Sequence, residues 1–417
     1  MACRVRPHAP VLVALISLAG GCGGPSTPSG LEARASGSAL AGRVEITVID
    51  DASGAVVSGA VVRARSIASG EVIAEGTTDA AGLVALEAAG LTGSISIEAA
   101  SPSAAQIFVG VRTGELVVAL PSAAPARTSV MGNVRGLPGS TSTVEVGVAT
   151  DVSLLRTPSL ERASTDTCVR EGDGCTFSLP RAAGPDAIAI ATAVDEAGEV
   201  VGFVSGTLGA GGGTLSTLLP AEELVMTLPS ASGLTGIVGV PGVADDGALT
   251  LLTQPQTSAA RLRVPTLAGS LAGSSYWLVV EARPFTGAGM VDTAARTVLF
   301  ARGVHGAAEL PTWSAWLPAP TATLDATASV TLDMVPGADV HAIDWLDASG
   351  NVRASAWVLD DTLIGLDNLL PSGLAARDVA TVRVRAIDTT SPPSASGWSA
   401  GALEVGVERF SERVLTR

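Results

Sequence analysis

Residues 43–48 read Arg43-Val44-Glu45-Ile46-Thr47-Val48, so apolar and polar side chains alternate along this stretch. A period of two residues puts each kind of side chain on its own face of a strand, which predicts a β-strand with one buried face. Similar short runs follow at Ala60–Ala64, Glu71–Glu75, Leu83–Glu87, Ser94–Glu98, Gln106–Val111 and Glu115–Leu120. Seven short strands separated by turn residues predict a two-sheet β-sandwich.

Aspartate and glycine mark the turns between such runs. The pattern Asp-x-x-Gly occurs at Asp51–Gly54, Asp79–Gly82, Asp195–Gly198 and Asp347–Gly350. Aspartate at the first turn position accepts backbone N–H bonds, and glycine at the fourth adopts the left-handed conformation that reverses the chain. The alternative is calcium binding, because the acidic pairs at 50–51, 245–246 and 360–361 offer oxygen ligands. The sequence contains no EF-hand and no nonapeptide repeat, so the pattern favours ordinary hairpin turns.

Three short motifs follow one another within residues 43–121. They are the turn Asp51-Ala52-Ser53-Gly54, the strand motif Val57-x-Gly59-Ala60-x-Val62, and the turn Thr77-Thr78-Asp79-Ala80-Ala81-Gly82. In this order they resemble the carboxypeptidase-regulatory-like, prealbumin-type module of secreted and envelope proteins. Such modules are non-catalytic accessory domains, so the resemblance implies a structural or binding role.

A nine-residue segment occurs twice, 108 residues apart. Glu115–Ala123 reads Glu-Leu-Val-Val-Ala-Leu-Pro-Ser-Ala, and Glu223–Ala231 reads Glu-Leu-Val-Met-Thr-Leu-Pro-Ser-Ala, with seven identical positions. We interpret each copy as the last strand of one domain followed by a linker, because a new opening strand follows each. Chance similarity in a chain rich in Ala, Leu and Val is the alternative. A fainter third instance lies at Leu317–Pro320. The predicted β-sandwich domains are therefore 43–121, 128–229, 234–318 and 319–417.

The last predicted domain has its own set of motifs. In chain order they are Val330–Met334, Val335-Pro336-Gly337-Ala338, Val340–Ile343, Thr381–Asp388 and Gly397-Trp398-Ser399. They resemble strand B, the following turn, strand C, strand F and the start of the final strand of a fibronectin type III domain. Met334 and His341 stand where that family usually has Trp and Tyr, so the resemblance implies an immunoglobulin-like sandwich more firmly than a type III domain. The predicted fold class is all-β: tandem immunoglobulin-like and prealbumin-like β-sandwiches after a signal peptide and a flexible tether.

The N-terminus has the pattern of an export signal. Arg4 and Arg6 precede an apolar run, Val11–Ala19, which is too short to span a bilayer. The next residues complete the segment Leu18-Ala19-Gly20-Gly21-Cys22, which resembles the lipobox of bacterial lipoproteins, although Ala19 stands where that family prefers Leu. The resemblance implies a signal peptide at 1–21 and lipidation of Cys22. An ordinary secretory signal with an incidental cysteine is the alternative.

The residues after Cys22 refine the expected location. Residues 22–42 are rich in Gly, Pro and Ser, which predicts a flexible tether between a membrane anchor and the folded domains. In Gram-negative lipoproteins an aspartate directly after the lipidated cysteine retains the protein at the inner membrane. Gly23 stands there instead, so the resemblance implies a cell-envelope protein anchored at the outer membrane, facing the periplasm or the cell surface.

Two further cysteines, Cys168 and Cys175, lie close together in Cys168-Val169-Arg170-Glu171-Gly172-Asp173-Gly174-Cys175. An isolated pair in an exported protein predicts a disulfide, and the two glycines let so short a loop close. The metal-site alternative is weaker, because two thiolates without a nearby histidine do not complete a closed site.

The composition excludes several classes of function. None of the 25 basic residues is lysine, so the chain has no P-loop lysine, no Schiff-base lysine and no Ser-x-x-Lys pair. Three histidines without a metal-ligand spacing predict no metal site, and nothing in the sequence predicts a cofactor. The 40 acidic residues and the net charge of −15 argue against nucleic-acid binding. No catalytic residue is predicted, although a geometric Ser-His-Asp triad leaves no trace in residue order.

All six tryptophans and the single tyrosine lie after residue 270: Tyr276, Trp277, Trp313, Trp316, Trp345, Trp357 and Trp398. We expect Trp345, Trp357 and Trp398 to fill sandwich cores. Trp313 and Trp316 lie in the Pro-flanked segment 311–318, where exposure or packing between domains is expected, so they are the candidate binding residues. Two hypotheses follow: a non-enzymatic, lipid-anchored array acting as stalk, scaffold or adhesive surface, or an accessory protein that binds a glycan or protein partner through its Trp-bearing domains. A hydrolase with an unrecognised triad is a third, weaker hypothesis.

Overall fold

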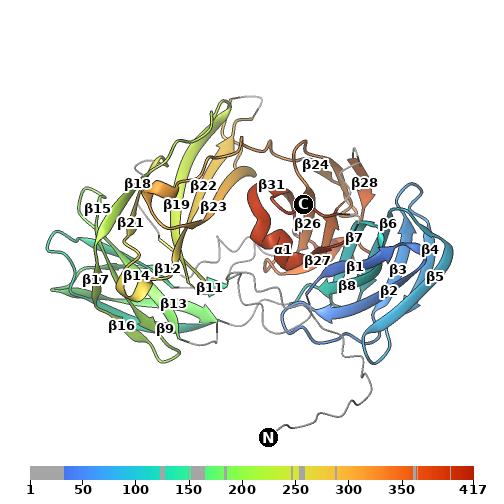
Figure 1. The fold of residues 1–417 in the computed structure, drawn as a ribbon, viewed down its shortest axis with the longest axis horizontal. Coiled ribbons are helices and arrows are strands. Elements are labelled where there is room, and N and C mark those ends of the chain that lie inside the picture. The colour runs from blue at the N-terminus through green and yellow to red at the C-terminus, as the bar shows by residue number, and fades with distance from the viewer. Residues whose placement is uncertain are drawn as a thin grey trace, which may run out of the picture.

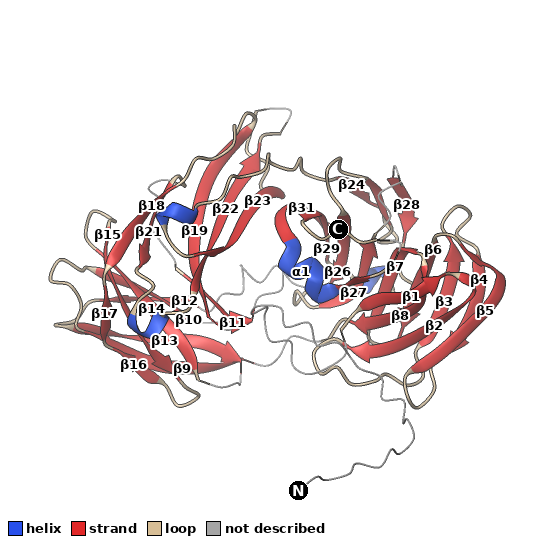
Figure 2. Cartoon of the chain, viewed as in Figure 1, coloured by secondary structure: helices blue, strands red, loops and turns tan. Residues whose placement is uncertain are grey.

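The chain is almost entirely β-structure. The computed structural model describes residues 32–122, 127–148, 150–151, 165–182, 186–245, 248–252, 259–286, 289–359, 363, 365–394 and 396–417. Across these ranges there are strands β1 to β31, a few 3₁₀ turns and one short α-helix, α1 (Ala400–Gly406) (Figure 2). The all-β fold class is confirmed. No helix in these ranges is long and apolar enough to cross a membrane.

The first domain packs two sheets face to face. Val44, Ile46 and Val48 are fully buried while the residues between them are exposed or half-buried, as the period of two predicts. The seven strands expected from the sequence are confirmed as β2 to β8. Their bounds are β2 (Ala41–Asp50), β3 (Val61–Ser66), β4 (Val72–Thr77), β5 (Leu83–Thr92), β6 (Ile95–Ala100), β7 (Ala105–Val111) and β8 (Thr113–Leu120).

The predicted tether is too long at its C-terminal end. Strand β1 (Arg34–Ala39) lies inside the range 22–42, pairs with β8, and is followed at once by β2. Its small apolar residues explain the error: Ala33 and Ala35 are only 2% and 4% exposed, yet the stretch Ala-Ser-Gly-Ser-Ala has the composition of a linker. Cys22 and the predicted signal peptide, residues 1–21, lie outside the described residues.

The second domain also has two sheets. Its three-stranded sheet has the order β13-β9-β16, and its five-stranded sheet has the order β12-β10-β14-β15-β17. The bounds are β9 (Arg127–Arg135), β10 (Thr143–Val148), β12 (Thr165–Val169), β13 (Gly174–Ala182), β14 (Ala187–Val194), β15 (Val200–Leu208), β16 (Gly213–Leu215) and β17 (Thr217–Leu219). The short strand β11 (Thr150–Asp151) leaves this domain and pairs with the third.

The third domain begins earlier than the repeat suggested. Strand β18 (Ala221–Val225), in the second copy of the repeat, pairs with β21 (Arg261–Pro265), so it does not close the second domain. The reason is packing, because Leu224 and Met226 are buried in the same cluster as Leu262 and Val264. The remaining strands are β19 (Leu234–Asp245), β20 (Ala248–Leu251), β22 (Ser275–Pro284) and β23 (Ala295–Val304).

The fourth domain is a sandwich of a three-stranded sheet, β24-β25-β28, and the strands β27-β26-β29-β31. Trp345 is fully buried between them, and its indole N–H donates to the Ala328 carbonyl at 2.9 Å. The bounds are β24 (Thr321–Leu324), β25 (Val330–Asp333), β26 (Val340–Leu346), β27 (Val352–Val358), β28 (Gly365–Leu369), β29 (Thr381–Thr389), β30 (Trp398–Ser399) and β31 (Val407–Thr416).

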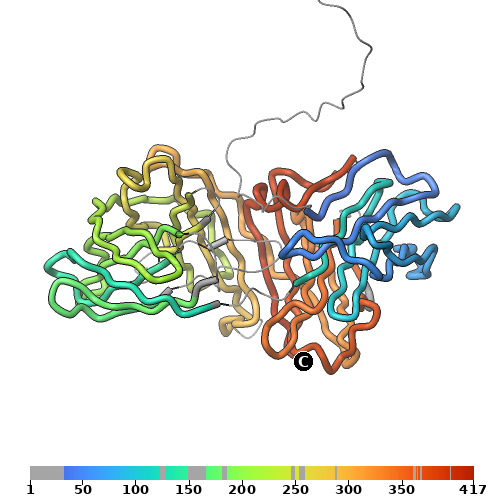
Figure 3. The backbone as a smooth tube through the Cα atoms, turned by 90° about the horizontal axis from the view of Figure 1, so that it is seen from below, coloured from blue at the N-terminus to red at the C-terminus, as the bar shows by residue number. Residues whose placement is uncertain are grey.

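One long sheet runs through three of the domains. Its thirteen strands have the order β11-β20-β19-β22-β23-β31-β29-β26-β27-β7-β6-β3-β4. Strand β23 of the third domain pairs with β31 of the fourth, and β27 of the fourth pairs in parallel with β7 of the first. The order in space is therefore second, third, fourth, first, with the blue first domain beside the orange and red fourth domain (Figures 1 and 3). A simple tandem string was expected, but sheet edges that would otherwise be exposed are paired across domain borders.

Two of the tryptophans expected in sandwich cores lie at this border instead. Trp357 on β27 is 4% exposed and meets Phe108 of the first domain, with ring centroids 5.5 Å apart. Trp398 on β30 is half-buried and lies 5.1 Å from the same phenylalanine ring. Strand β30 pairs with β1, so these aromatic side chains join the first and fourth domains.

Candidate binding cleft between the third and fourth domains

The long sheet opens between β23 and β31. The two strands pair from Ala295–Arg413 to Leu299–Arg409, and the pairing ends there. Strand β23 continues to Val304, while β31 extends back only to Val407, where α1 precedes it. A cleft of about 270 Å³ lies in this opening. It is lined by residues 299–304 of β23, by 405–408 at the end of α1 and the start of β31, by Thr390, and by Glu309 with 311–314. One of the two candidate binding residues from the sequence, Trp313, lines it, whereas Trp316 does not.

Trp313 forms an aromatic wall of this cleft. Trp313 and Trp316 are both half-buried and pack against the apolar core of the third domain. Of the two, Trp313 alone also lines the cleft shared with the fourth domain. Each indole N–H is buried without a hydrogen-bond partner among the described residues. Buried donors usually have a partner, so these two N–H groups are unusual.

Arg302 supplies the positive charge of the cleft. Its guanidinium carbon lies 4.6 Å from the centre of the Trp277 ring, and Nη1 donates to the Glu404 carbonyl at the end of α1. Burial lowers the pKa of Arg302, and the charge of Glu404 opposes that shift. Among the described residues, Nε and Nη2 have no acceptor. Arg302 and Trp313 both line the cleft, but these N–H groups are enclosed by the protein, and the two side chains pack against opposite faces of the sheet.

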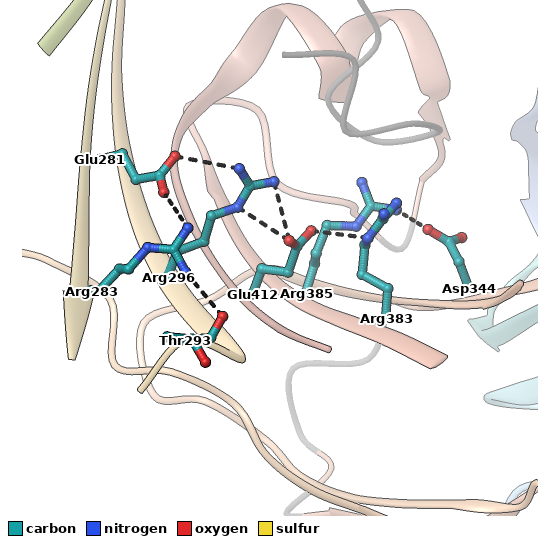
Figure 4. A network of polar contacts seen from close by, with 8 residues as sticks. All are labelled: Glu281, Arg283, Thr293, Arg296, Asp344, Arg383, Arg385 and Glu412. Atoms are coloured by element: carbon teal, nitrogen blue, oxygen red, sulfur yellow. Dashed lines mark hydrogen bonds and ion pairs between the residues drawn. The ribbon is translucent and has the colours of Figure 1, made fainter. Parts of the chain in front are cut away.

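A buried ionic network holds the paired halves of β23 and β31 together beside the cleft (Figure 4). Arg296 on β23 contacts Glu412 on β31 at 3.1 Å and Glu281 on β22 at 3.3 Å. Glu412 also contacts Arg383 on β29 at 3.4 Å. Buried charges are costly unless they are paired, so the network strongly favours this alignment of the third and fourth domains.

In the Asp-x-x-Gly turns, the aspartate carboxylate accepts hydrogen bonds from backbone N–H groups in or just after the same turn. Asp79 Oδ1 accepts from the Ala81 and Leu83 N–H groups at 2.9 Å, and Gly82 has φ +71°. The turns at Asp195 and Asp347 have the same bonds. The first turn differs from the prediction, because Asp50 rather than Asp51 accepts the Ser53 N–H. No cluster of three or more potential metal ligands lies within the described ranges.

The other predicted site residues lie apart from the cleft. Cys168 and Cys175 form a disulfide that joins β12 to β13 in the second domain, with 5.9 Å between their Cα atoms. Cys22, the expected lipidation site, is outside the described residues. Sequence reasoning missed Arg302 and the segment 405–408. Arg302 is the only charged residue in Val298-Leu299-Phe300-Ala301-Arg302-Gly303-Val304, and that isolation in an apolar run was the available signal.

Neither a protein-family model nor a curated protein matches the chain. Several solved structures are similar over part of it. The shaft pilin SpaA from Lactobacillus rhamnosus GG is 13% identical, with 46% of this chain and all of that chain covered and a TM-score of 0.16. The Bacillus anthracis TIE protein is 12% identical over 60% of this chain and 46% of its own, with the same TM-score. BcpA, the major pilin subunit of Bacillus cereus, is 11% identical over 60% and 91%, also at 0.16. At such TM-scores these likenesses carry no argument about function.

Proposed function

We propose that this protein is a non-enzymatic, lipid-anchored protein of the cell envelope whose β-sandwich domains form one rigid scaffold. The observation that carries the proposal is the thirteen-stranded sheet, which passes through the third, fourth and first domains without a break. Domains joined by linkers alone move relative to one another by default. Here their relative movement would require breaking β-ladders, so a scaffold is a better description than a flexible stalk.

The junction between the first and fourth domains supports rigidity. Strands β7 and β27 pair from Ala105–Ala354 to Val109–Val358. Near this ladder, the buried Glu98 of β6 accepts from both the backbone N–H and the hydroxyl of Ser372. A carboxylate that is 2% exposed needs such partners, because unpaired it would destabilise the fold by several kcal/mol. The chain therefore folds back so that its two ends share one interface.

The anchor part of the proposal rests on the lipobox-like segment before Cys22. Strand β1 begins at Arg34, twelve residues after Cys22. At about 3.5 Å per residue, that stretch can reach at most about 40 Å. Domains held this close to the membrane suit a scaffold that displays a surface near the lipid. The same holds whether the protein faces the periplasm or the exterior.

The second candidate function is an accessory protein that binds a partner or glycan through its Trp-bearing domains. The cleft between the third and fourth domains, lined by Trp313 and Arg302, favours it specifically. The two functions are compatible, because a rigid scaffold holds such a cleft in a constant shape.

The test combines lipid labelling with a measurement of shape. Metabolic labelling with alkyne palmitate should mark the protein and place it in the outer-membrane fraction. The Cys22→Ala variant should lose both, whereas the matched Cys3→Ala variant should keep them, because Cys3 leaves with the signal peptide. Small-angle scattering of the mature chain should show one compact particle. A labelled Cys22→Ala protein would disprove the anchor, and scattering from an extended, flexible chain would disprove the scaffold.

A further inference from the structure

The thirteen-stranded sheet ends in an open edge at β4. Strand β3 pairs with one side of β4, and no strand within the described ranges pairs with its other side. This edge is accessible to solvent: Val72 is 46% exposed, Glu75 and Thr77 are also exposed, and the other residues of β4 are half-buried. Figure 1 shows β4 at the outer end of the first domain, far from the second domain. Unpaired backbone donors and acceptors in a row are what another strand pairs with.

Alternate residues of β4 direct their backbone groups to this open side. Thr78, directly after β4, faces the β3 side, because its N–H donates to the carbonyl of residue 60 and its carbonyl accepts from the N–H of residue 59. In an antiparallel ladder, the backbone groups of successive residues point to opposite sides of the strand. The pairing with β3 is regular from Ala74 to Thr77. The N–H and C=O groups of Glu75 and Thr77 therefore point away from β3, toward the open side.

Strand β4 lacks the features that usually protect an open edge, which are proline, unpaired charge and short length. It has six residues, with no proline and no basic residue, and its one charged residue, Glu75, forms an ion pair with Arg63 of β3 at 2.5 Å. The edge strand β13 differs, because it contains Pro180 and its Ser178 N–H donates to Asp166 at 2.7 Å. The edge strands β16 and β17 have three residues each.

The chain already joins its own domains by contacts of this kind. Strand β23 pairs with β31 between the third and fourth domains, and β27 pairs with β7 between the fourth and the first. A strand added at β4 would continue the same sheet. Strand β5, the open edge of the other sheet in the first domain, is less suitable, because its pairing with β2 shifts register between Glu87 and Thr92.

We propose that β4 pairs antiparallel with β4 of a second copy of this chain about a two-fold axis, so that the two long sheets become one. The inference goes beyond the proposed scaffold, because it assigns an interaction surface and its partner. A two-fold contact is self-complementary, since both copies present the same edge. Growth into a filament is not expected, because the other end of the sheet, β11, has two residues and cannot match the six of β4.

Electrostatic repulsion limits the affinity of this dimer. The chain carries a net charge of −15, so two copies repel one another at long range. At the contact itself, Arg63 neutralises Glu75, and Val72 provides exposed apolar surface. A contact made by one strand is small, so we expect a weak dimer that becomes tighter as salt screens the repulsion.

Sedimentation equilibrium of the mature chain, in an excess of detergent micelles, measures the dimer directly. We expect monomer and dimer, with the dimer fraction rising as the concentration increases to about 200 µM. Raising NaCl from about 50 mM to about 500 mM should tighten the dimer at least threefold. At the highest concentration, amide exchange at Glu75 and Thr77 should slow at least threefold relative to dilute protein, whereas exchange in β5 should not change.

Variants at Glu75 separate main-chain pairing from side-chain contacts. Glu75→Pro removes the N–H that points to the open side and leaves the ladder with β3 intact, so it should weaken the dimer at least tenfold. Glu75→Ala is the matched control, because it removes the same carboxylate and keeps the N–H. It should change the affinity by less than threefold. Circular dichroism and urea unfolding check the fold of both variants, and the exchange measurement on the native chain tests the contact even where Glu75→Pro fails to fold.

Three results would overturn the inference. One is a chain that stays monomeric over the whole concentration range. Another is a dimer whose affinity a folded Glu75→Pro variant leaves unchanged. The third is exchange protection outside β4, or oligomers that grow beyond the dimer. None of these results bears on the lipid anchor or on the rigidity of a single chain, so failure here leaves the proposed scaffold testable on its own.

Discussion

The stability of the fourth domain should depend on pH through His341. This residue is 4% exposed on β26, and its Nε2 accepts the backbone N–H of Val335 at 2.9 Å. Burial lowers the pKa of His341 from 6.5 to about 4. The folded protein thus holds the imidazole neutral where the unfolded chain would protonate it.

The sign and the size of the effect follow from that difference. Because the folded pKa lies below the unfolded one, the unfolded state binds more protons as the pH falls, and the free energy of unfolding decreases. The decrease begins near pH 6.5 and is complete below about pH 4. At 1.36 kcal/mol per pH unit it totals about 3 kcal/mol, of which about 2 kcal/mol is lost by pH 5.

The assay is urea unfolding followed by tryptophan fluorescence at pH 7, 6 and 5. Trp345, which is fully buried in the same domain, reports its unfolding. His341→Gln keeps an acceptor for Val335 but cannot protonate. The unfolding free energy of the native chain should therefore fall by about 2 kcal/mol more than that of the variant between pH 7 and pH 5. The exposed His305→Gln is the matched control and should follow the native chain. A difference between native and His341→Gln that stays constant with pH would refute the reasoning.

Three other predictions concern the disulfide, the domain border and the cleft. Mass spectrometry of the unreduced protein should find Cys168 linked to Cys175. Replacing both with Ser should lower the unfolding free energy of the second domain by about 2–3 kcal/mol, because the disulfide restricts the unfolded chain by closing a loop with a sequence separation of 7. Free thiols at both positions would contradict this prediction. Glu98→Ala should lower the unfolding free energy by about 3 kcal/mol, because Ser372 and Arg65 lose their carboxylate partner. It should also make the border of the first and fourth domains sensitive to proteases, whereas the control Glu75→Ala, at an exposed ion pair, should have little effect. The double variant Trp313→Ala, Trp316→Ala should lower the unfolding free energy, measured in urea, by about 2–4 kcal/mol, because both rings are half-buried on the third domain. A loss below about 1 kcal/mol would mean that the two rings are exposed.

Local features of the fold could be predicted from the sequence, because they depend on neighbouring residues. The alternation at Val44, Ile46 and Val48 predicts a strand with one buried face, and these three residues are buried. The residues of the turn Asp79–Gly82 predict the hydrogen bonds that Asp79 accepts within and just after that turn. The error at residues 34–39 has a physical cause. Small side chains can fill a tight interface between strands as well as a linker, and composition does not distinguish the two.

The arrangement of the domains could not be predicted in the same way. Pairing of β7 with β27 joins residues about 250 positions apart, and no periodicity within either strand encodes a partner. The candidate site was predicted in part: Trp313 was singled out by its Pro-flanked surroundings, but Arg302 lines the same cleft only because the pairing of β23 with β31 ends at Leu299. A site at a domain border depends on contacts between distant segments, and the residue pattern of a single strand does not predict those contacts.

Helix α1 links the start of the described chain, at residues 32–33, to the cleft. At its start, the Gly401 N–H donates to the carboxylate of Glu32, and Ala400 N–H donates to the Ala33 carbonyl, just before β1. At its end, residues 405–408 line the cleft. A helix of 7 residues is about 10 Å long, so the cleft lies within about 10 Å of the point where the proposed tether enters the fold. With a proposed tether of at most about 40 Å, the cleft would lie within about 50 Å of the proposed lipid anchor. Shortening residues 23–31 should therefore bring the cleft closer to the membrane without altering the fold, because the described structure begins at residue 32.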